Sequence, residues 1–308
     1  MKLFENTDYD FLGRRKIAYL ASLAVILIGL VSVILNQGLN YHIDFEGGLS
    51  LEVVPYSVTE PHTLTVGQVR EALHRNGVTS AEIQELLRTN SFLIRTKAGE
   101  KGGDEILRIM REEFPNHTNH EDFIRSQEEV GPRAGADLRR KAVNAVLISL
   151  VFMLVYIWIR FRFVWGFIAA FGLFHDTLIA LVVISLLNIE IGMTVMAGLL
   201  TIVAYSVNNT IVIFDRIREN LKLYRKDDDA AIINRSINET LSRTIITSFS
   251  TLLVCIPLMI FGGAAIFNFA FIFTIGIIAG TYCSWFIATG LIYDIVLVSK
   301  TKKLAKKK

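Results

Sequence analysis

The sequence predicts a polytopic α-helical membrane protein, with six transmembrane helices and one α+β domain between the first and second helices. Hydrophobic residues make up 52% of the 308 residues, charged residues only 20%, and the mean hydropathy is +0.44. The apolar residues form long uncharged runs, and about 20 such residues cross a bilayer as a helix. Soluble enzymes, disulfide-rich scaffolds and disordered chains match this composition poorly. Both cysteines, Cys255 and Cys283, lie within apolar runs, so neither a disulfide framework nor a zinc site is expected.

Six runs are apolar and long enough to be spans, although the second is slightly short and the last is long. Arg14–Lys16 precede the first run, as in a signal peptide. Its apolar part is longer than a signal core and no small-residue cleavage site follows, so we expect an uncleaved helix. The runs are Ile17–Leu35, Val143–Ile159, Val164–Leu187, Gly192–Phe214, Ile245–Phe261 and Phe267–Val298.

Basic residues in the connecting segments predict the orientation. Asn188–Ile191 and Gly262–Ala265 contain no Lys or Arg, and they alternate with segments that carry basic side chains. Because basic loops stay in the cytoplasm, both termini are expected there and residues 37–140, with a net charge of −5, are expected outside. The basic segments are Arg14–Lys16, Arg160–Arg162, residues 215–243 with seven basic side chains, and residues 300–308 with six.

These boundaries predict four parts of the chain. Residues 1–36 form the cytoplasmic N-terminus and first helix, 37–140 the extracytoplasmic domain, 141–299 helices two to six, and 300–308 a basic cytoplasmic tail.

The extracytoplasmic domain is expected to contain four strands and two helices. Leu49, Leu51 and Val53 alternate with polar residues, which is typical of a strand. Thr65 can cap a helix that ends at Asn76-Gly77. The full order is strand 49–54, helix 65–76, strands 81–87 and 91–96, helix 103–114 and strand 121–130. This β-α-β-β-α-β order predicts a ferredoxin-like fold, which does not by itself assign a function.

The third span carries two ionisable residues near its middle, His175 and Asp176. Ionisable groups within a span are costly and are candidates for a functional site. A buried polar pair that fixes helix packing and a role in ion movement are both open, because adjacent residues do not face the same way on a helix. One His and one carboxylate give too few ligands for a zinc site, and no activated Ser or Cys is apparent.

Spans four and five carry further polar residues. Tyr205, Ser206 and Asn209 are spaced to form one stripe, with Asn208 beside them. On span five, Thr247 belongs to a series of hydroxyls that can join helices through hydrogen bonds. Arg243 begins this series and is expected either to face the seam between spans four and five or to reach the cytoplasmic surface. Before it, residues 227–241 are expected to form an amphipathic helix at the cytoplasmic interface.

Several motifs give the chain a resemblance to the SecF family, membrane subunits that assist the bacterial Sec protein-translocation channel. They run in family order over nearly the whole length, and the string that contains Asp215, Arg216, Arg218 and Glu219 is quite specific. The motifs are Ile43–Gly48, Val130–Pro132, His175-Asp176, Ile189–Ile191, Tyr205–Asn208, Phe214–Asn220, Arg243-Thr244 and Gly262-Gly263.

The resemblance implies a non-enzymatic, multi-pass subunit of the bacterial cytoplasmic (inner) membrane. Its expected partners are a SecD-like subunit, the Sec translocation channel, unfolded preprotein and the lipid bilayer, without nucleic acid, cofactor or metal. Its expected role is to assist late translocation, using the proton or sodium motive force together with SecD. SecF proteins generally carry Asn-Asp-Thr in span four, whereas this chain has Asn208-Asn209-Thr210. An amide has no exchangeable charge in the physiological range, so the family's candidate proton carrier is missing.

Three other functions remain open. The resemblance also implies membership of the resistance-nodulation-division superfamily, and a half-size small-molecule exporter of that superfamily would need a partner to supply the other half. A purely structural subunit is favoured by Asn209. An intramembrane enzyme with His175 as its base is the weakest alternative, because the sequence shows no nucleophile beside it.

Overall fold

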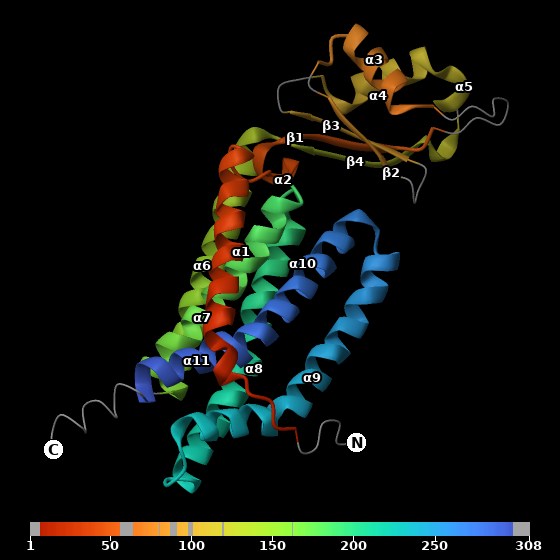
Figure 1. The fold of residues 1–308 in the computed structure, drawn as a ribbon. Helices are drawn as coiled ribbons and strands as arrows, with labels where there is room; N and C mark the ends of the chain where they lie inside the picture. The colour runs from red at the N-terminus through yellow and green to blue at the C-terminus, as the bar shows by residue number, and fades with distance from the viewer. Residues whose placement is uncertain are drawn as a thin grey trace. The chain divides into compact units, whose positions relative to one another are not determined.

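The computed structural model describes residues 7–55, 64–79, 81–86, 91–97, 101–118, 120–161 and 163–297 (Figure 1). The predicted basic tail 300–308 and Arg162 lie outside these residues. The chain divides into two units, one made of residues 1–40 and 144–308 and the other of residues 41–143.

The unit of residues 41–143 is built around a four-stranded sheet. Its strands are β1 (Gly48–Val53), β2 (Glu82–Leu86), β3 (Ser91–Lys97) and β4 (Ile124–Val130). They lie in the order β2-β3-β1-β4, and all neighbours are antiparallel. β1 pairs Leu51 with Ile94 of β3 and with Gln127 of β4.

Two helices connect the strands and cover the apolar core of this unit. α3 (Val66–Arg75) begins with a capping box between Thr65 and Gln68, and α4 (Gly103–Glu113) places Ile106 and Met110 in the core. Both helices bury one apolar face against Leu51, Val53 and Ile94. The short helical pieces are α2 (Ile43–Glu46), α5 (Pro115–Thr118) and η2 (Glu121–Phe123). The last strand therefore begins three residues later than expected.

Six helices among the described residues are long and apolar enough to cross a membrane. Their cores match the six predicted runs. They are α1 (Arg15–Leu35) with η1 (Leu12–Arg14) before it, α6 (Pro132–Arg160), α7 (Phe163–Leu186), α8 (Met193–Leu223), α9 (Asp229–Phe261), and α10 (Gly263–Tyr282) with its continuation η3 (Cys283–Ala288), α11 (Thr289–Leu291) and η4 (Ile292–Leu297).

The amphipathic helix expected before span five is not a separate helix. Asp228 caps α9, which runs without a break through the predicted span. Ile233, Ile237 and Leu241 pack into the core of the bundle with Phe214 of α8. Their apolar stripe therefore packs against neighbouring helices of the bundle.

α7 and α8 are the enclosed helices of the bundle, whereas α1, α6 and α9 bury few of their apolar side chains. Small residues allow α10 to approach α8 closely. A Cβ added at Gly276 would lie 2.2 Å from Ile202 of α8, and one at Gly280 would lie 3.1 Å from Oγ of Ser206. Close packing of this kind is typical of small-residue faces in membrane helices. It brings the polar residues of α7, α8 and α10 together.

Candidate functional site

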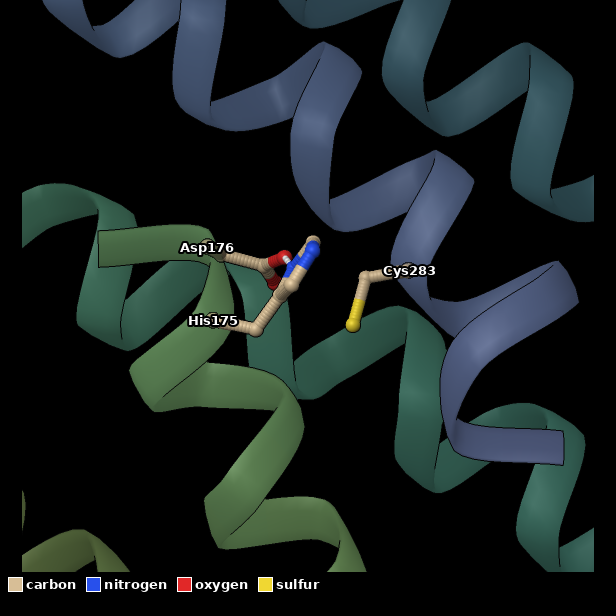
Figure 2. Close-up of side chains that lie close together, drawn as sticks. All are labelled: His175, Asp176 and Cys283. Carbon is tan, nitrogen blue, oxygen red and sulfur yellow. Dashed lines mark hydrogen bonds and ion pairs between the residues drawn. The ribbon is translucent and has the colours of Figure 1, made fainter. Parts of the chain in front are cut away.

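His175 and Asp176 lie at the centre of the bundle, on α7. Their side chains are 4% and 1% exposed, and Nδ1 of His175 lies 3.0 Å from Oδ1 of Asp176. We expected adjacent residues to face different ways, but both side chains enter one buried polar cluster (Figure 2). Burial of an ionisable pair is tolerated when its groups satisfy each other's hydrogen bonds.

Three residues from other helices complete this cluster. Oγ of Ser22, on α1, lies 3.0 Å from Nε2 of His175, and Ser206, on α8, donates to Oδ2 of Asp176. Ser22 also bonds the hydroxyl of Tyr282 at 3.2 Å, and Tyr282 donates to the carbonyl of Ala18 at 2.7 Å. We call Ser22, His175, Asp176, Ser206 and Tyr282 the central network. It joins α1, α7, α8 and α10.

Cys283 lies beside the central network, at the start of the π-helical segment η3. Its Sγ and the donor atoms of His175 and Asp176 all lie within 4.8 Å of one another (Figure 2). Such N, O and S donors suit a transition metal. Both ring nitrogens of His175 are already hydrogen-bonded, however, and Cys283 bonds the carbonyl of Gly172. As folded, the donors form a hydrogen-bonded network and not a preformed cation site.

The sequence showed no nucleophile beside His175, but in the structure the hydroxyl of Ser22 lies next to it. The order Ser22, His175, Asp176 follows the contacts of a hydrolase triad. A hydrolase also needs donors for the oxyanion, whereas the backbone N–H groups around Ser22 lie within helix α1. Ser22 is only 7% exposed. The contacts are those of a buried polar junction between helices.

The stripe predicted on α8 divides between two neighbourhoods. Ser206 faces α7, whereas Nδ2 of Asn209 approaches Oγ of Ser248 on α9 at 3.4 Å and Oγ1 of Thr281 on α10 at 3.5 Å. Ser248 and Thr281 are 3.0 Å apart, and Asn209 is 3% exposed. We call Asn209, Ser248 and Thr281 the amide cluster. It occupies the position where the SecF resemblance expects a carboxylate.

The other polar residues predicted for this region lie outside both clusters. The Tyr205 hydroxyl accepts a hydrogen bond from Thr251 at 3.4 Å, and Thr247 donates to the backbone carbonyl of Arg243 on its own helix. Asn208 is exposed.

Arg243 does not enter the seam between α8 and α9. Its side chain is exposed, and it forms no ion pair or hydrogen bond with any residue that the structure describes. On a helix, the exposed Arg243 and the buried Thr244 necessarily face different directions. The guanidinium is thus presented on the outer surface of α9.

The motif of residues 215–220 ties three helices together through its polar side chains. Asp215 of α8 pairs with Arg160 of α6. Arg216 pairs with Glu219 at 2.7 Å and with Glu239 of α9 at 2.6 Å. Arg218 is exposed. This end of α8 is fixed by ion pairs, which explains why the helix extends nine residues beyond the apolar run.

Asn220 strengthens the junction between α8 and α9. It is fully buried and donates to Oε2 of Glu239 at 2.7 Å and to Ser236 at 3.0 Å. Glu239 therefore bonds both Arg216 and Asn220.

Comparison with known proteins decides the family. Residues 111–298 match the family described as protein export membrane protein SecD/SecF, C-terminal. The chain belongs to this SecD/SecF family. It is 40% identical over 307 residues to the protein translocase subunit SecF of Rhodothermus marinus, covering 96% of each chain. It is 36% identical over 299 residues to that of Endomicrobium trichonymphae, covering 96% of this chain and 93% of the relative. The resemblance to SecF is confirmed.

Solved structures of SecDF are similar to nearly the whole chain. The crystal structure of SecDF from Thermus thermophilus, a translocon-associated membrane protein, matches with a TM-score of 0.82 and 34% identity over 96% of this chain. SecDF in its super-membrane-facing form matches with a TM-score of 0.69 and 32% identity over 99% of this chain. The chain spans only 39% and 41% of those two SecDF chains.

Proposed function

We propose that the chain is an auxiliary, non-enzymatic subunit of the Sec protein-export machinery. It assists late translocation of preproteins across the cytoplasmic membrane, using a proton or sodium motive force together with a SecD-like partner. The observation that carries this proposal is the similarity over 96% of the chain to SecF subunits and to 39% of a longer SecDF chain. A separate subunit would correspond to the remainder of SecDF.

The proposed placement follows from charge and fold. The sheet order β2-β3-β1-β4, with a helix between β1 and β2 and another between β3 and β4, supports a ferredoxin-like domain. We place this domain outside and both termini inside, because basic residues flank the spans on the other side. The multi-pass chain then lies in the bacterial inner membrane, in contact with lipid, the Sec channel and unfolded preprotein.

The proposed ion pathway runs through the polar interior of the bundle. His175 and Asp176 are the ionisable groups at its centre, and the amide cluster lies beside them on the other face of α8. Tyr205, Asn208 and Thr247 flank these clusters, while Arg243 faces outward, where a partner subunit can meet it. The motif with Asp215, Arg216, Arg218 and Glu219 fixes the end of α8 that we place in the cytoplasm.

A structural role without ion movement is the second candidate, because Asn209 occupies the expected carboxylate position. Co-purification of the tagged full chain from the bacterial membrane, followed by mass spectrometry, tests the assignment. We expect a SecD-like subunit in stoichiometric amount, and depletion of the chain should slow export of a reporter preprotein. An isolated homo-oligomer, with export unchanged on depletion, would contradict the proposal and favour an exporter.

A further inference from the structure

The central network forms one uninterrupted series of hydrogen bonds. From one end, the contacts are Tyr282 to the carbonyl of Ala18 (2.7 Å), Ser22 to Tyr282 (3.2 Å) and Ser22 to His175 (3.0 Å). His175 then contacts Asp176 (3.0 Å), which accepts from Ser206. When one hydrogen is assigned to each contact, the number of protons in the series can be counted.

The count starts at the carbonyl, which only accepts. The single hydrogen of Tyr282 must point to Ala18, so the hydrogen between Tyr282 and Ser22 must come from Ser22. Ser22 then has no hydrogen left for His175, and Nε2 of His175 must donate to it. At the other end, Ser206 supplies the hydrogen to Asp176.

The contact between His175 and Asp176 still requires one more proton. Together with the proton on Nε2, the pair holds two. It is either an imidazolium with a carboxylate or a neutral imidazole with a carboxylic acid, and its net charge is zero in both forms. A neutral pair suits an apolar bundle, where an uncompensated charge is costly.

Removal of one proton changes the contacts in a defined way. The pair becomes a neutral imidazole with a carboxylate, and its net charge falls to −1. Nδ1 keeps its hydrogen for Asp176, so Nε2 has only a lone pair and must accept from Ser22. Ser22 has one hydrogen and must turn it away from Tyr282. The hydrogen bond from Ser22 of α1 to Tyr282 of α10 is then lost, whereas the bond from Tyr282 to the carbonyl of Ala18, also on α1, is kept.

We propose that His175 and Asp176 form a proton-binding site whose second proton keeps Ser22 bonded to Tyr282. Release breaks the Nε2–H bond, passes the proton to water and frees Tyr282 from Ser22. Uptake reverses these steps. The site thus converts one proton into the making or breaking of one contact between transmembrane helices. Its use in export rests on the proposed function, whereas the proton site itself does not.

The other titratable groups near the site do not supply the missing proton. The hydroxyl of Tyr282, on α10, donates to Ala18. The thiol of Cys283, on η3, lies beside Asp176 and interacts with it, and it also bonds the carbonyl of Gly172. The residues that contact the pair from α1 and α8 are Ser22 and Ser206, which do not titrate. On η4, Asp294 is engaged by Arg15 and Tyr19 of α1. The second proton must therefore be exchanged with water or with a partner.

Nitrogen NMR of the purified full chain, labelled with ¹⁵N-histidine in lipid nanodiscs, tests this site directly. The signals of His175 are assigned as those that disappear from the spectrum of the His175→Gln variant. We expect Nε2 to be protonated at low pH and to lose its proton as the pH rises. Tyr282→Phe should lower the midpoint of the Nε2 titration by about one pH unit, because the Ser22 hydroxyl can then donate to Nε2 without losing a bond to Tyr282. Ser22→Ala should act in the same direction, since Nε2–H loses its acceptor.

Tyr19→Phe is the matched control, because its hydroxyl bonds Asp294 outside the central network. It should leave the midpoint unchanged. Nε2 without a proton throughout the titration would overturn the proposal, as would equal midpoints in wild type, Tyr282→Phe and Ser22→Ala. This titration measures no export, so a negative result would leave the proposed function unaffected. Conversely, the chain could show the proton site even if no SecD-like partner co-purified with it.

Discussion

Oγ of Ser22 lies 3.0 Å from Nε2 of His175, although 153 residues separate the two in sequence. The contact joins α1, most of whose surface is exposed in the isolated chain, to α7 at the centre of the bundle. It makes the first helix part of the ionisable site. Along the chain, α1 leads into the unit of residues 41–143.

Asn209→Asp should fold and should change the pH or ion dependence of export. Ser248 and Thr281 can each turn a hydroxyl toward a carboxylate at this position, so the new charge finds donors without rearrangement of the helices. Measurement of export rate against external pH, at matched abundance, checks this. An unchanged profile would mean that the amide cluster lies off the ion pathway. Asn208→Asp, at an exposed position on the same helix, serves as the control.

Gly280→Ala should weaken the contact between α8 and α10 at the central network. The added Cβ would lie 3.1 Å from Oγ of Ser206 and 3.4 Å from Oδ2 of Asp176, so Ser206 must shift from its position beside the carboxylate. We expect a loss of about 1–3 kcal/mol in unfolding free energy. Gly198→Ala is the matched control, because its Cβ would approach no atom closer than 3.4 Å. Equal stability of the two variants, measured by denaturation in detergent, would contradict the packing argument.

The sequence predicted the spans well because their signal is local. Length and hydropathy identify six spans, and the alternation of Leu49, Leu51 and Val53 identifies β1. Only part of the central network could be predicted from the sequence. His175 and Asp176 stand out as ionisable residues in an apolar run, whereas Ser22 is an ordinary serine in the first span and Tyr282 one of several aromatic residues in the last. Their roles depend on helix packing, which no spacing along the chain encodes.

Two features of α9 that the sequence left uncertain have the same physical origin. Arg243 was expected either to face the seam or to reach the cytoplasmic surface, and the helical phase puts its neighbour Thr244 inside and Arg243 outside. Residues 227–241 were expected to form a separate amphipathic helix at the cytoplasmic interface. From Asp229 they are instead the first turns of α9, and their apolar stripe packs on α8, because periodicity cannot tell a helix-facing stripe from a lipid-facing one.

Asn238→Ala should release the segment before α1 from α9. Asn238 exchanges two hydrogen bonds with the backbone of Tyr9, at 3.1 and 3.0 Å, and Asn234 bonds Asp10 at 2.8 Å. Loss of the two part-buried bonds of Asn238 to Tyr9 should cost about 1–3 kcal/mol. Faster proteolysis near Tyr9 would report the release, and Asn208→Ala, at an exposed site, should leave cleavage unchanged. Equal cleavage rates in both variants would contradict the docking.

The same junction gives the folded state a dependence on acid pH. Hydrogen bonds from the Gly13 N–H and from Asn234 hold the pKa of Asp10 below its ordinary value of 3.8. A lowered carboxyl pKa stabilises the folded state above the ordinary value, and this contribution is lost as the pH falls through the folded-state pKa. Asp10→Asn should therefore remove the contribution at neutral pH and match wild type only in strong acid.

Cysteine labelling tests the orientation that the basic residues predict. Thr79 and Lys226 are both exposed, so single cysteines there, in a Cys255→Ser, Cys283→Ala background, should be equally reactive in lysed cells. In intact spheroplasts, an impermeant maleimide should label only the cysteine at position 79. Labelling of position 226 alone would invert the orientation and would place the sheet-bearing unit in the cytoplasm.

We predict that this chain's own ionisable pair, His175 and Asp176, couples an ion gradient to export. Asp176→Asn can preserve the contacts of the two-proton state, because its amide donates to Nδ1 and its oxygen accepts from Ser206, but it cannot release a proton. The most direct measurement is gradient-driven export into inverted membrane vesicles, at matched abundance of the chain and its partner, for wild type, Asp176→Asn and His175→Gln. We predict that both variants assemble normally and lose most of the stimulation by the gradient. Undiminished stimulation in both variants would contradict the claim and would assign the carrier to the partner.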